Sequence, residues 1–320
     1  MMMRALFNRM SPSGVGGCLS VFIFHRVLPL ADPLFPAEID ARRFDAICSW
    51  IAQWFNVLPL DEAVARLRPG TLPARAAAIT FDDGYADNFG VALPILSRHR
   101  LSATFFIATG FVDGGCMWND MVIESVRRTN LDRLPLEKLE GLNLQGMPIR
   151  ESSEKSAAIT VLIDKFKYLP VDQRFALVSQ LASLTEVSLP TDLMMTSDEI
   201  RGMRRHGMLI GAHTVSHPIL AKMSISDARD EIAQSKRTLE DLLGEDVRLF
   251  AYPNGKPGVD FTDETVGIVR ELGFDAAVTT KWAVSRSDAD LFQVARFTPW
   301  DHDKFRFGLR LLGNMRTVHQ

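Results

Sequence analysis

The sequence predicts an α/β fold in which a parallel sheet or barrel is covered by helices. Short apolar runs alternate with helical patterns through most of the 320 residues, as in chains that join parallel strands by helices. The runs are apolar along their whole length, which is typical of strands buried on both faces. With 47% hydrophobic residues, a chain of this length can bury one large core, so we expect a single domain over residues 1–320.

Each element of this fold has a local signal. The expected strands are residues 19–24, 76–81, 103–108, 208–213, 247–252, 275–279 and 292–297. The expected helices include residues 40–55, 196–207, 226–243 and 263–272. Thr196 and Glu199 have the spacing of a capping box at the start of one helix. Gly244 and Gly273 follow two others, at positions where glycine commonly ends a helix.

One segment, residues 118–193, breaks the alternation. It has charged, helix-favouring stretches and no run that predicts a strand, so we interpret it as a helical insertion that begins with Trp118, a candidate substrate contact. It follows the strand that ends near Thr109, which places it at the carboxyl ends of the strands, where barrel active sites lie. A substrate-shaping lid and a passive cover agree equally well with this position.

Composition excludes some classes of function. A net charge of −3 provides no basic surface of the kind that nucleic-acid binding requires. The three cysteines lack the spacing of a metal site or a disulfide framework, so we expect small buried hydrophobes. The apolar run 15–24 leads directly into His25 and Arg26 rather than into a signal-peptide cleavage site, so we expect a cytoplasmic protein.

Both ends of the chain mix apolar and basic residues. No apolar stretch reaches the ~18–20 residues that cross a bilayer. Met1, Leu6 and Phe7 near the N-terminus, and Phe305 and Leu309 near the C-terminus, lie among arginines. Packing of terminal helices is the favoured interpretation, and weak peripheral contact with the inner face of a membrane is the alternative. The sequence does not indicate an oligomeric state.

The first polar motif follows an expected strand. Residues 80–84, Thr-Phe-Asp-Asp-Gly, lead from an apolar run into two carboxylates and a glycine that permits a sharp turn. Adjacent side chains of an extended chain point to opposite sides. Asp82 and Asp83 should therefore occupy different positions and take different roles.

The second motif contains two histidines. His213-Thr-Val-Ser-His217-Pro218 comes at the end of another expected strand, and Pro218 disfavours a helical conformation at His217. Two imidazoles and a carboxylate from another strand make a three-ligand site with open positions for water and substrate, as in catalytic zinc centres. Either motif alone could be a helix cap or a core histidine. Together, at successive strand ends, they indicate a site.

Three further polar features lie at strand ends. Tyr252-Pro253-Asn254 is either a simple turn or a loop that directs a backbone amide at an oxyanion, with Tyr252 and Pro253 against the substrate. His25 ends the first expected strand and Arg296 the last. Taken alone, each of these two is as compatible with a structural role as with a catalytic one.

On these motifs the chain resembles the polysaccharide deacetylases of carbohydrate esterase family four, which remove acetyl groups from amino-sugar glycans such as chitin-like polymers and peptidoglycan. Residues 80–84 and 213–218 match the first and second motifs of that family at every position. The similarity covers residues 19–112 and 196–297 and leaves the insertion outside. It implies a distorted (β/α) barrel with fewer than eight strands, and a hydrolase of carbon–nitrogen bonds other than peptide bonds.

The resemblance also implies a metal site. Asp83, His213 and His217 would bind a divalent metal, commonly zinc, and Asp82 would be the general base that deprotonates the attacking water. The Asn254 backbone amide would donate to the oxyanion. Family members usually carry an aromatic residue at this position, so the usual stacking contact with the sugar is in doubt.

Two further departures from the family pattern affect catalytic roles. The third motif normally carries an arginine that pairs with the base, where this chain has Ala251; Arg296 is the candidate substitute. The late Leu-x-His motif that supplies the general acid is missing. A subgroup supplies the acid from an early Tyr-His-like strand end instead, and His25 fits that pattern.

The substrate expected from the resemblance is an N-acetylated glycan or a precursor of an exopolysaccharide or cell-envelope glycan. A glycan-binding protein that keeps the fold without turnover stays open, since fold does not dictate activity. An Asp-rich strand end also begins Mg²⁺-dependent phosphatases with an aspartyl nucleophile. The two imidazoles count against that class, because Mg²⁺ prefers oxygen ligands.

Overall fold

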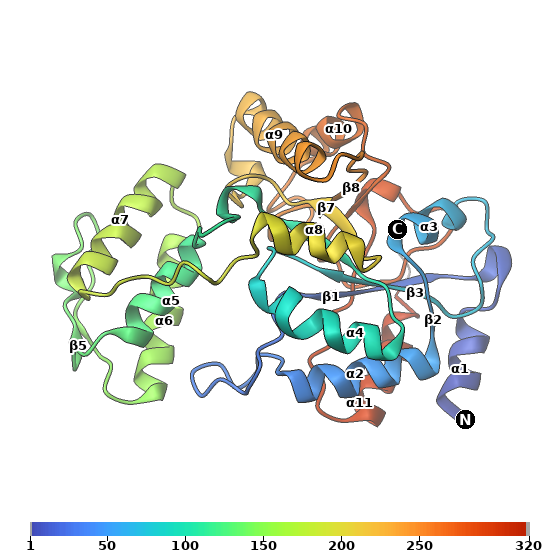
Figure 1. The fold of residues 1–320 in the computed structure, drawn as a ribbon, viewed down its shortest axis with the longest axis horizontal. Coiled ribbons are helices and arrows are strands. Elements are labelled where there is room, and N and C mark those ends of the chain that lie inside the picture. The colour runs from blue at the N-terminus through green and yellow to red at the C-terminus, as the bar shows by residue number, and fades with distance from the viewer. Residues whose placement is uncertain (1, 318–320) are drawn as a thin grey trace.

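A curved parallel sheet forms the centre of the protein (Figure 1). The computed structural model describes residues 2–317; Met1 of the expected N-terminal helix lies outside that range. The seven-stranded sheet has the order β1-β3-β4-β7-β8-β9, with β2 beside β3, and its pairings are parallel. The strands are β1 (Leu19–Phe24), β2 (Asn56–Val57), β3 (Ala76–Phe81), β4 (Thr104–Ile107), β7 (Leu209–Ala212), β8 (Leu249–Ala251) and β9 (Ala276–Val278).

The segment 294–297 joins the two edges of this sheet. The Val294 N–H donates to the Ala277 carbonyl of β9 at 2.9 Å, and the Phe297 N–H donates to the Val21 carbonyl of β1 at 2.7 Å. The continuous strand expected over 292–297 is replaced by isolated bridges, because the intervening Arg296 N–H donates to Lys281 instead. The sheet is a distorted barrel with fewer than eight strands, which confirms the predicted fold class.

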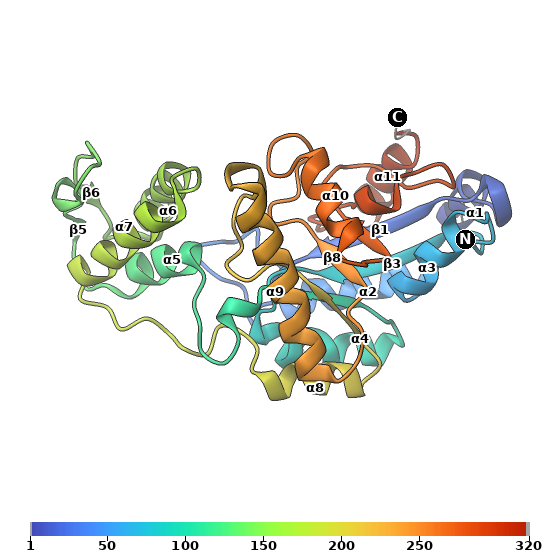
Figure 2. The same cartoon turned by 90° about the horizontal axis from the view of Figure 1, so that it is seen from above.

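Helices surround the barrel (Figures 1 and 2). They are α1 (Met2–Met10), α2 (Ala41–Trp54), α3 (Leu60–Leu67), α4 (Leu93–His99), α8 (Ser197–Arg205), α9 (Ile225–Leu243), α10 (Asp263–Glu271) and α11 (Lys304–Asn314). Thr196 and Glu199 form the expected capping box of α8. Gly244 and Gly273 have φ values of +68° and +77° after α9 and α10, as expected for glycines that end helices.

Side chains alternate between the inside and the outside of the barrel along each strand. In β3, Ala76 and Ala78 belong to the inner apolar cluster, whereas Ala77 and Ile79 belong to the outer cluster beneath the helices. Asp82 continues the inner series just beyond the carboxyl end of β3. The alternation therefore delivers a carboxylate to the open end of the barrel.

The insertion lies to one side of the barrel and has a core of its own (Figures 1 and 2). It contains α5 (Trp118–Arg128), α6 (Ser152–Phe166) and α7 (Val171–Leu184). It also contains a short antiparallel pair, β5 (Arg133–Leu134) with β6 (Met147–Pro148). The expectation of no strand was wrong, because strands of two residues are too short to show a pattern.

The terminal helices pack against the barrel and against each other. Phe7 of α1 and Phe307 of α11 are fully buried, whereas Leu6, Phe305 and Leu309 are exposed. Among residues 2–317, no helix is long and apolar enough to span a membrane. Two cysteines, Cys18 and Cys48, are buried as expected, but Cys116 is only partly buried.

Candidate active site

Three side chains converge at the carboxyl end of the barrel, over β4. Asp83 follows β3, and His213 and His217 follow β7. The Nε2 atoms of the two histidines each lie 3.4 Å from Asp83 Oδ1. One potential ligand atom from each residue lies within 4.8 Å of the other two. The structure thus brings together the three residues expected to bind a metal.

Left-handed backbone conformations position two of these side chains. Asp83 has φ +76° and is followed by Gly84 with φ +90°; His217 has φ +52°. Strand alternation alone would direct Asp83 to the outer face, but the sharp turn brings its carboxylate to the barrel mouth. His217 is non-helical as expected, although it adopts the left-handed region rather than the extended one. Such conformations cost about 1–3 kcal/mol each in non-glycine residues and are concentrated at functional sites.

A hydrogen bond orients the ring of His213 as a ligand, and burial keeps the ring of His217 neutral. His213 Nδ1 lies 2.7 Å from the Ala251 carbonyl and must donate to it, so the lone pair of the neutral ring is on Nε2, which faces Asp83. Burial lowers the pKa of His217 to about 4, which keeps this ring neutral at neutral pH. Burial also acts to lower the pKa of His213, but the facing carboxylates of Asp83 and Asp82 outweigh it and raise that pKa.

Asp83 has a buried carboxylate oxygen, Oδ1, without a hydrogen-bond donor among the described residues. This arrangement is costly for a carboxylate. Burial acts to raise the pKa of Asp83, but the neighbouring imidazoles of His213 and His217 outweigh burial and hold that pKa below the ordinary range of an aspartate. One carboxylate and two imidazoles fit a divalent cation of the zinc type.

Asp82 is held by Arg296 on the inside of the barrel. Arg296 is 1% exposed, and its Nη1 and Nη2 each donate to one Asp82 oxygen at 2.7 Å. Its Nε donates to the Thr279 carbonyl at 2.8 Å. Burial raises the pKa of Asp82, but the charge of Arg296 outweighs it and holds that pKa below its ordinary value. Asp82 is therefore ionised, and Arg296 is placed where the sequence analysis expected it.

The turn after β8 brings one of its three candidate residues to the site. Asn254 has φ +58° and lines a cavity together with Asp83 and His217. Its carbonyl accepts from the Thr280 hydroxyl at 2.8 Å, and no described residue accepts from its N–H. The Asn254 amide is therefore free to donate to a ligand.

Tyr252 and Pro253 do not reach the substrate space. The Tyr252 ring is fully buried, stacks on Phe261 with 3.8 Å between ring centroids, and donates its hydroxyl to the Phe292 carbonyl. Tyr252 continues the outer series of Phe250 in β8, so the expectation of a pocket wall was wrong. Pro253 is also buried and lines none of the described cavities.

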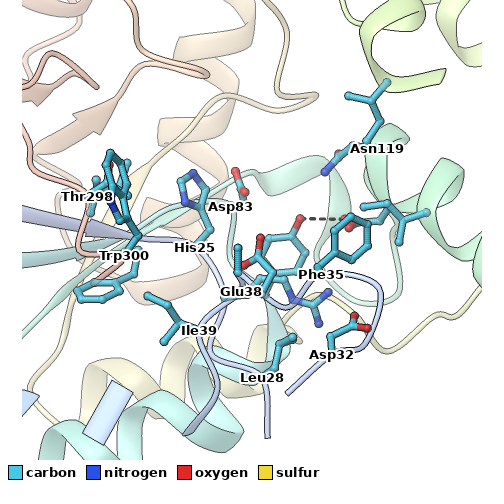
Figure 3. Close-up of a pocket in the computed structure, with 18 of the residues that line it drawn as sticks. His25, Leu28, Asp32, Phe35, Glu38, Ile39, Asp83, Asn119, Thr298 and Trp300 are labelled. Atoms are coloured by element: carbon cyan, nitrogen blue, oxygen red, sulfur yellow. Dashed lines mark hydrogen bonds between the residues drawn. The ribbon is translucent and has the colours of Figure 1, made fainter. Parts of the chain in front are cut away.

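Two cavities meet at Asp83. The larger, here the His25 cavity, has a volume of about 450 Å³. In Figure 3, His25 lies near Asp83, Trp300 lies at one side and Phe35 and Asn119 at the other. The second, here the Trp118 cavity, has a volume of about 200 Å³ and is lined by Asp83, His217, Asn254 and residues of the insertion. Because the insertion contributes walls to both, its position favours the substrate-shaping role over the passive cover.

Sequence reasoning missed a buried polar pair in the His25 cavity. The Tyr85 hydroxyl donates to Asp120 Oδ2 at 3.0 Å, and Arg26 lies over the Tyr85 ring at 4.6 Å. Burial raises the pKa of Asp120 to about 7. A lone aspartate in the first turn of a predicted helix carries no signal of this role. Asp120 links the insertion to the turn that holds Asp83.

Comparisons with known proteins agree with this geometry. A family model described as polysaccharide deacetylase matches residues 70–134 and 157–277, more than half of the chain. The match extends into the insertion, so the expectation that the similarity leaves the insertion outside was wrong. Both metal-site motifs lie within the matched ranges.

Individual relatives are distant in sequence. YxkH of Bacillus subtilis (strain 168), named as a polysaccharide deacetylase, is 19% identical over 261 residues, which cover 81% of this chain and 64% of YxkH. The match therefore spans less than two thirds of that relative.

Two solved structures share the fold over nearly their whole length. The Streptococcus pyogenes deacetylase PplD has a TM-score of 0.60 at 20% identity and covers 94% of this chain and 99% of its own. IcaB from Ammonifex degensii has a TM-score of 0.60 at 21% identity, with coverages of 96% and 99%. Together with the family match, the common fold shows that this chain belongs to the polysaccharide deacetylase family.

Proposed function

We propose that this protein is a metal-dependent hydrolase that removes the N-acetyl group from an amino-sugar glycan or a glycan precursor. One observation carries the proposal: Asp83, His213 and His217 converge on one point beside a separate, ionised carboxylate, Asp82. Family membership supports the same reaction. Neither a closed structural metal site nor a purely binding site needs the additional buried base.

Asp83, His213 and His217 would hold the cation, and zinc suits this donor set best. When bound, such an ion makes water more acidic and polarises a carbonyl oxygen. Asp82 accepts the proton of the attacking water. Arg296 keeps Asp82 ionised and fixes both of its oxygens, so the base is already oriented before substrate arrives.

Asn254 and His25 act on the substrate side of the site. The Asn254 N–H donates a hydrogen bond to the oxyanion that develops as the acetyl carbonyl is attacked. His25 is exposed at the cavity wall and delivers a proton to the departing sugar amine. Without that proton, the amine would leave as a strongly basic anion.

The His25 and Trp118 cavities suggest a substrate larger than one sugar, because both share Asp83 and lead from it toward different residues. We therefore propose a glycan chain, or a precursor of an exopolysaccharide or cell-envelope glycan, that extends to either side of the acetamido group. Action in the cytoplasm or on the inner membrane face stays a prediction. Fractionation of cells tests it, and recovery of the protein exclusively outside the cytoplasm would refute it.

The decisive experiment combines elemental analysis with an acetate-release assay. The purified protein should carry about one zinc or other transition-metal ion per chain and should release acetate from N-acetylated chitooligosaccharides. Chelation should abolish release, and added metal should restore it. Binding of the oligosaccharide by the metal-loaded protein without acetate release would favour the glycan-binding alternative. Hydrolysis of a phosphomonoester instead would favour the phosphatase.

A further inference from the structure

We propose that the groove leading from the metal site along the insertion contains an anion subsite, formed by Lys167, Arg174 and Lys222, that binds a phosphate or carboxylate group of the glycan. The inference rests on the proposed function, because it names the class of substrate that the same site accepts. It concerns negative charge on the substrate outside the acetamido group, either on the same sugar or on the next one.

Two hollows that share lining residues lie between the metal site and these cations. The Trp118 cavity begins at Asp83 and His217 and reaches Lys167 and Arg174. A further hollow of about 230 Å³ is lined by the same Lys167 and Arg174 and continues to Lys222. A glycan that places its acetamido group beside Asp83 can therefore extend past all three cations.

Arg174 is a buried cation without an anionic partner. It lies in the first turn of α7, is 4% exposed, and packs its guanidinium over the Trp118 ring at 4.9 Å. Within residues 2–317 its side chain makes one hydrogen bond, from Nη1 to the Lys167 carbonyl at 3.3 Å, and no salt bridge. A guanidinium carries five N–H donors, so most of its donor capacity is open to a ligand.

The contrast with Arg296 shows why this is unusual. Both guanidinium groups are buried, but Arg296 is neutralised by the two oxygens of Asp82. Burial alone lowers the pKa of Arg174, and no neighbouring carboxylate raises it. Desolvating a charge without a partner is costly, and an anionic ligand would remove that cost.

The remaining walls of the groove are also electropositive. Lys167 is half-buried and Lys222 exposed, and neither forms a salt bridge with a described residue. Apart from Asp83 at the metal site, the residues that line the two hollows include no carboxylate. The His25 cavity differs, since its two arginines, Arg26 and Arg127, form salt bridges with aspartates. Cations without a carboxylate partner are thus found on the Trp118 side of the metal site.

A phosphate or carboxylate is the chemistry that this arrangement recognises. The planar guanidinium binds either group through two parallel hydrogen bonds, and the lysines add point charges. Trp118 holds the guanidinium from one face, which reduces the conformational entropy lost on binding. We therefore expect an acidic glycan or a sugar phosphate rather than a neutral polymer.

Calorimetry with matched probes tests the subsite. N-acetylglucosamine 1-phosphate should bind the metal-loaded protein about tenfold more tightly than N-acetylglucosamine, the effect expected of a charged hydrogen-bonding partner. A disaccharide of glucuronic acid and N-acetylglucosamine, compared with neutral N,N′-diacetylchitobiose, tests a carboxylate. Preference for only one anionic probe identifies the source of the charge, and preference for neither overturns the proposal.

Substitutions test whether the preference for charged probes comes from the groove or from the metal. The double variant Lys167→Gln/Lys222→Gln should lose most of the preference, and Arg174→Gln should lose it further if thermal unfolding shows that the variant folds. Lys165→Gln, a matched change at an exposed position of α6 outside the groove, should keep the wild-type preference. If the double variant keeps the preference and removal of the metal abolishes it, the anion binds the metal instead, and the subsite is overturned.

The outcome is distinguishable from failure of the proposed function. If no acetate is released from any probe but the preference depends on Lys167 and Lys222, the anion subsite stands and the deacetylase does not. If acetate is released while charged and neutral probes bind equally, the deacetylase stands and the subsite does not.

Discussion

Arg296 and Asp82 form a buried, bidentate ion pair, although they are 214 residues apart in the chain. Both Nη atoms lie 2.7 Å from a carboxylate oxygen, and both side chains are almost fully shielded from water. The pair ties the segment that joins the sheet edges to the end of β3. It therefore serves the closure of the barrel as well as the orientation of the base.

Removing one partner of this pair should destabilise the fold. Arg296→Gln leaves Asp82 as a buried charge without a partner, a change that costs about 3–5 kcal/mol, and urea unfolding followed by circular dichroism measures it. Arg150→Gln is the control, because its salt bridge to Asp132 is exposed and should contribute less than about 1 kcal/mol. Similar losses in the two variants would contradict the proposed importance of the buried pair.

Substitution of the two adjacent aspartates should have different effects on metal binding and on turnover. Asp83→Asn replaces the one anionic ligand by a neutral amide and should lower both the bound metal and the rate, because the amide oxygen binds a cation more weakly than a carboxylate does. Asp82→Asn should keep the metal and reduce the rate by about 100-fold or more, as expected for loss of a general base. Elemental analysis measures the bound metal, and acetate release by the same preparations measures the rate. Full activity of Asp82→Asn would eliminate it as the base.

His25 should be needed for release of the sugar amine. If His25 donates the proton to the leaving amine, His25→Ala should lower the rate of acetate release by about 100-fold or more and leave the bound metal unchanged. Acetate release and elemental analysis of the same preparations measure both quantities. An unchanged rate in the variant would assign the acid to another group.

Asp120 should make the folded state less stable as the pH rises. Burial raises its pKa from 3.8 to about 7, so the folded state binds a proton that the unfolded state releases. The stabilisation is complete below pH ~4 and is lost as the pH rises toward ~7, by a total on the order of 4 kcal/mol. Asp120→Asn, which can still accept from Tyr85, should lack this component.

Chemical unfolding of both proteins between pH 4 and 8 measures the difference. The stability of Asp120→Asn minus that of the wild type should grow with pH over this range. Asp132→Asn, at an exposed position, is the control and should change stability by less than about 0.5 kcal/mol throughout. A difference for Asp120→Asn that does not vary with pH would mean that Asp120 does not titrate there.

The sequence predicted the barrel and the cluster at its mouth because both follow from short-range patterns. Apolar runs identify buried strands, and parallel strands bring their carboxyl ends to one edge of the sheet. Asp83 and His213 each follow such a strand, so both were expected at that edge. The conformation that aims Asp83 inward depends on a left-handed φ at a non-glycine residue. No pattern in the sequence indicated that conformation, although Gly84 marked the turn.

Other features depended on tertiary packing. Tyr252 looked like a pocket residue because it precedes a Pro-Asn-Gly turn, but its place in the outer series of β8 directs the ring into the core. The open donors of Arg174 and the raised pKa of Asp120 depend on what surrounds each side chain after folding. Strand and helix periodicity do not contain that information.

The insertion is stabilised by an apolar core separate from that of the barrel, yet it supplies walls to both cavities beside Asp83. In the proposed function, the residues that carry the reaction and part of the lining of both cavities thus belong to separately packed cores. Substitutions in α5, α6 and α7 would then change which glycan is accepted while the reacting groups keep their spacing. Exchange of this segment between related enzymes is therefore a direct way to transfer selectivity without rebuilding the reaction centre.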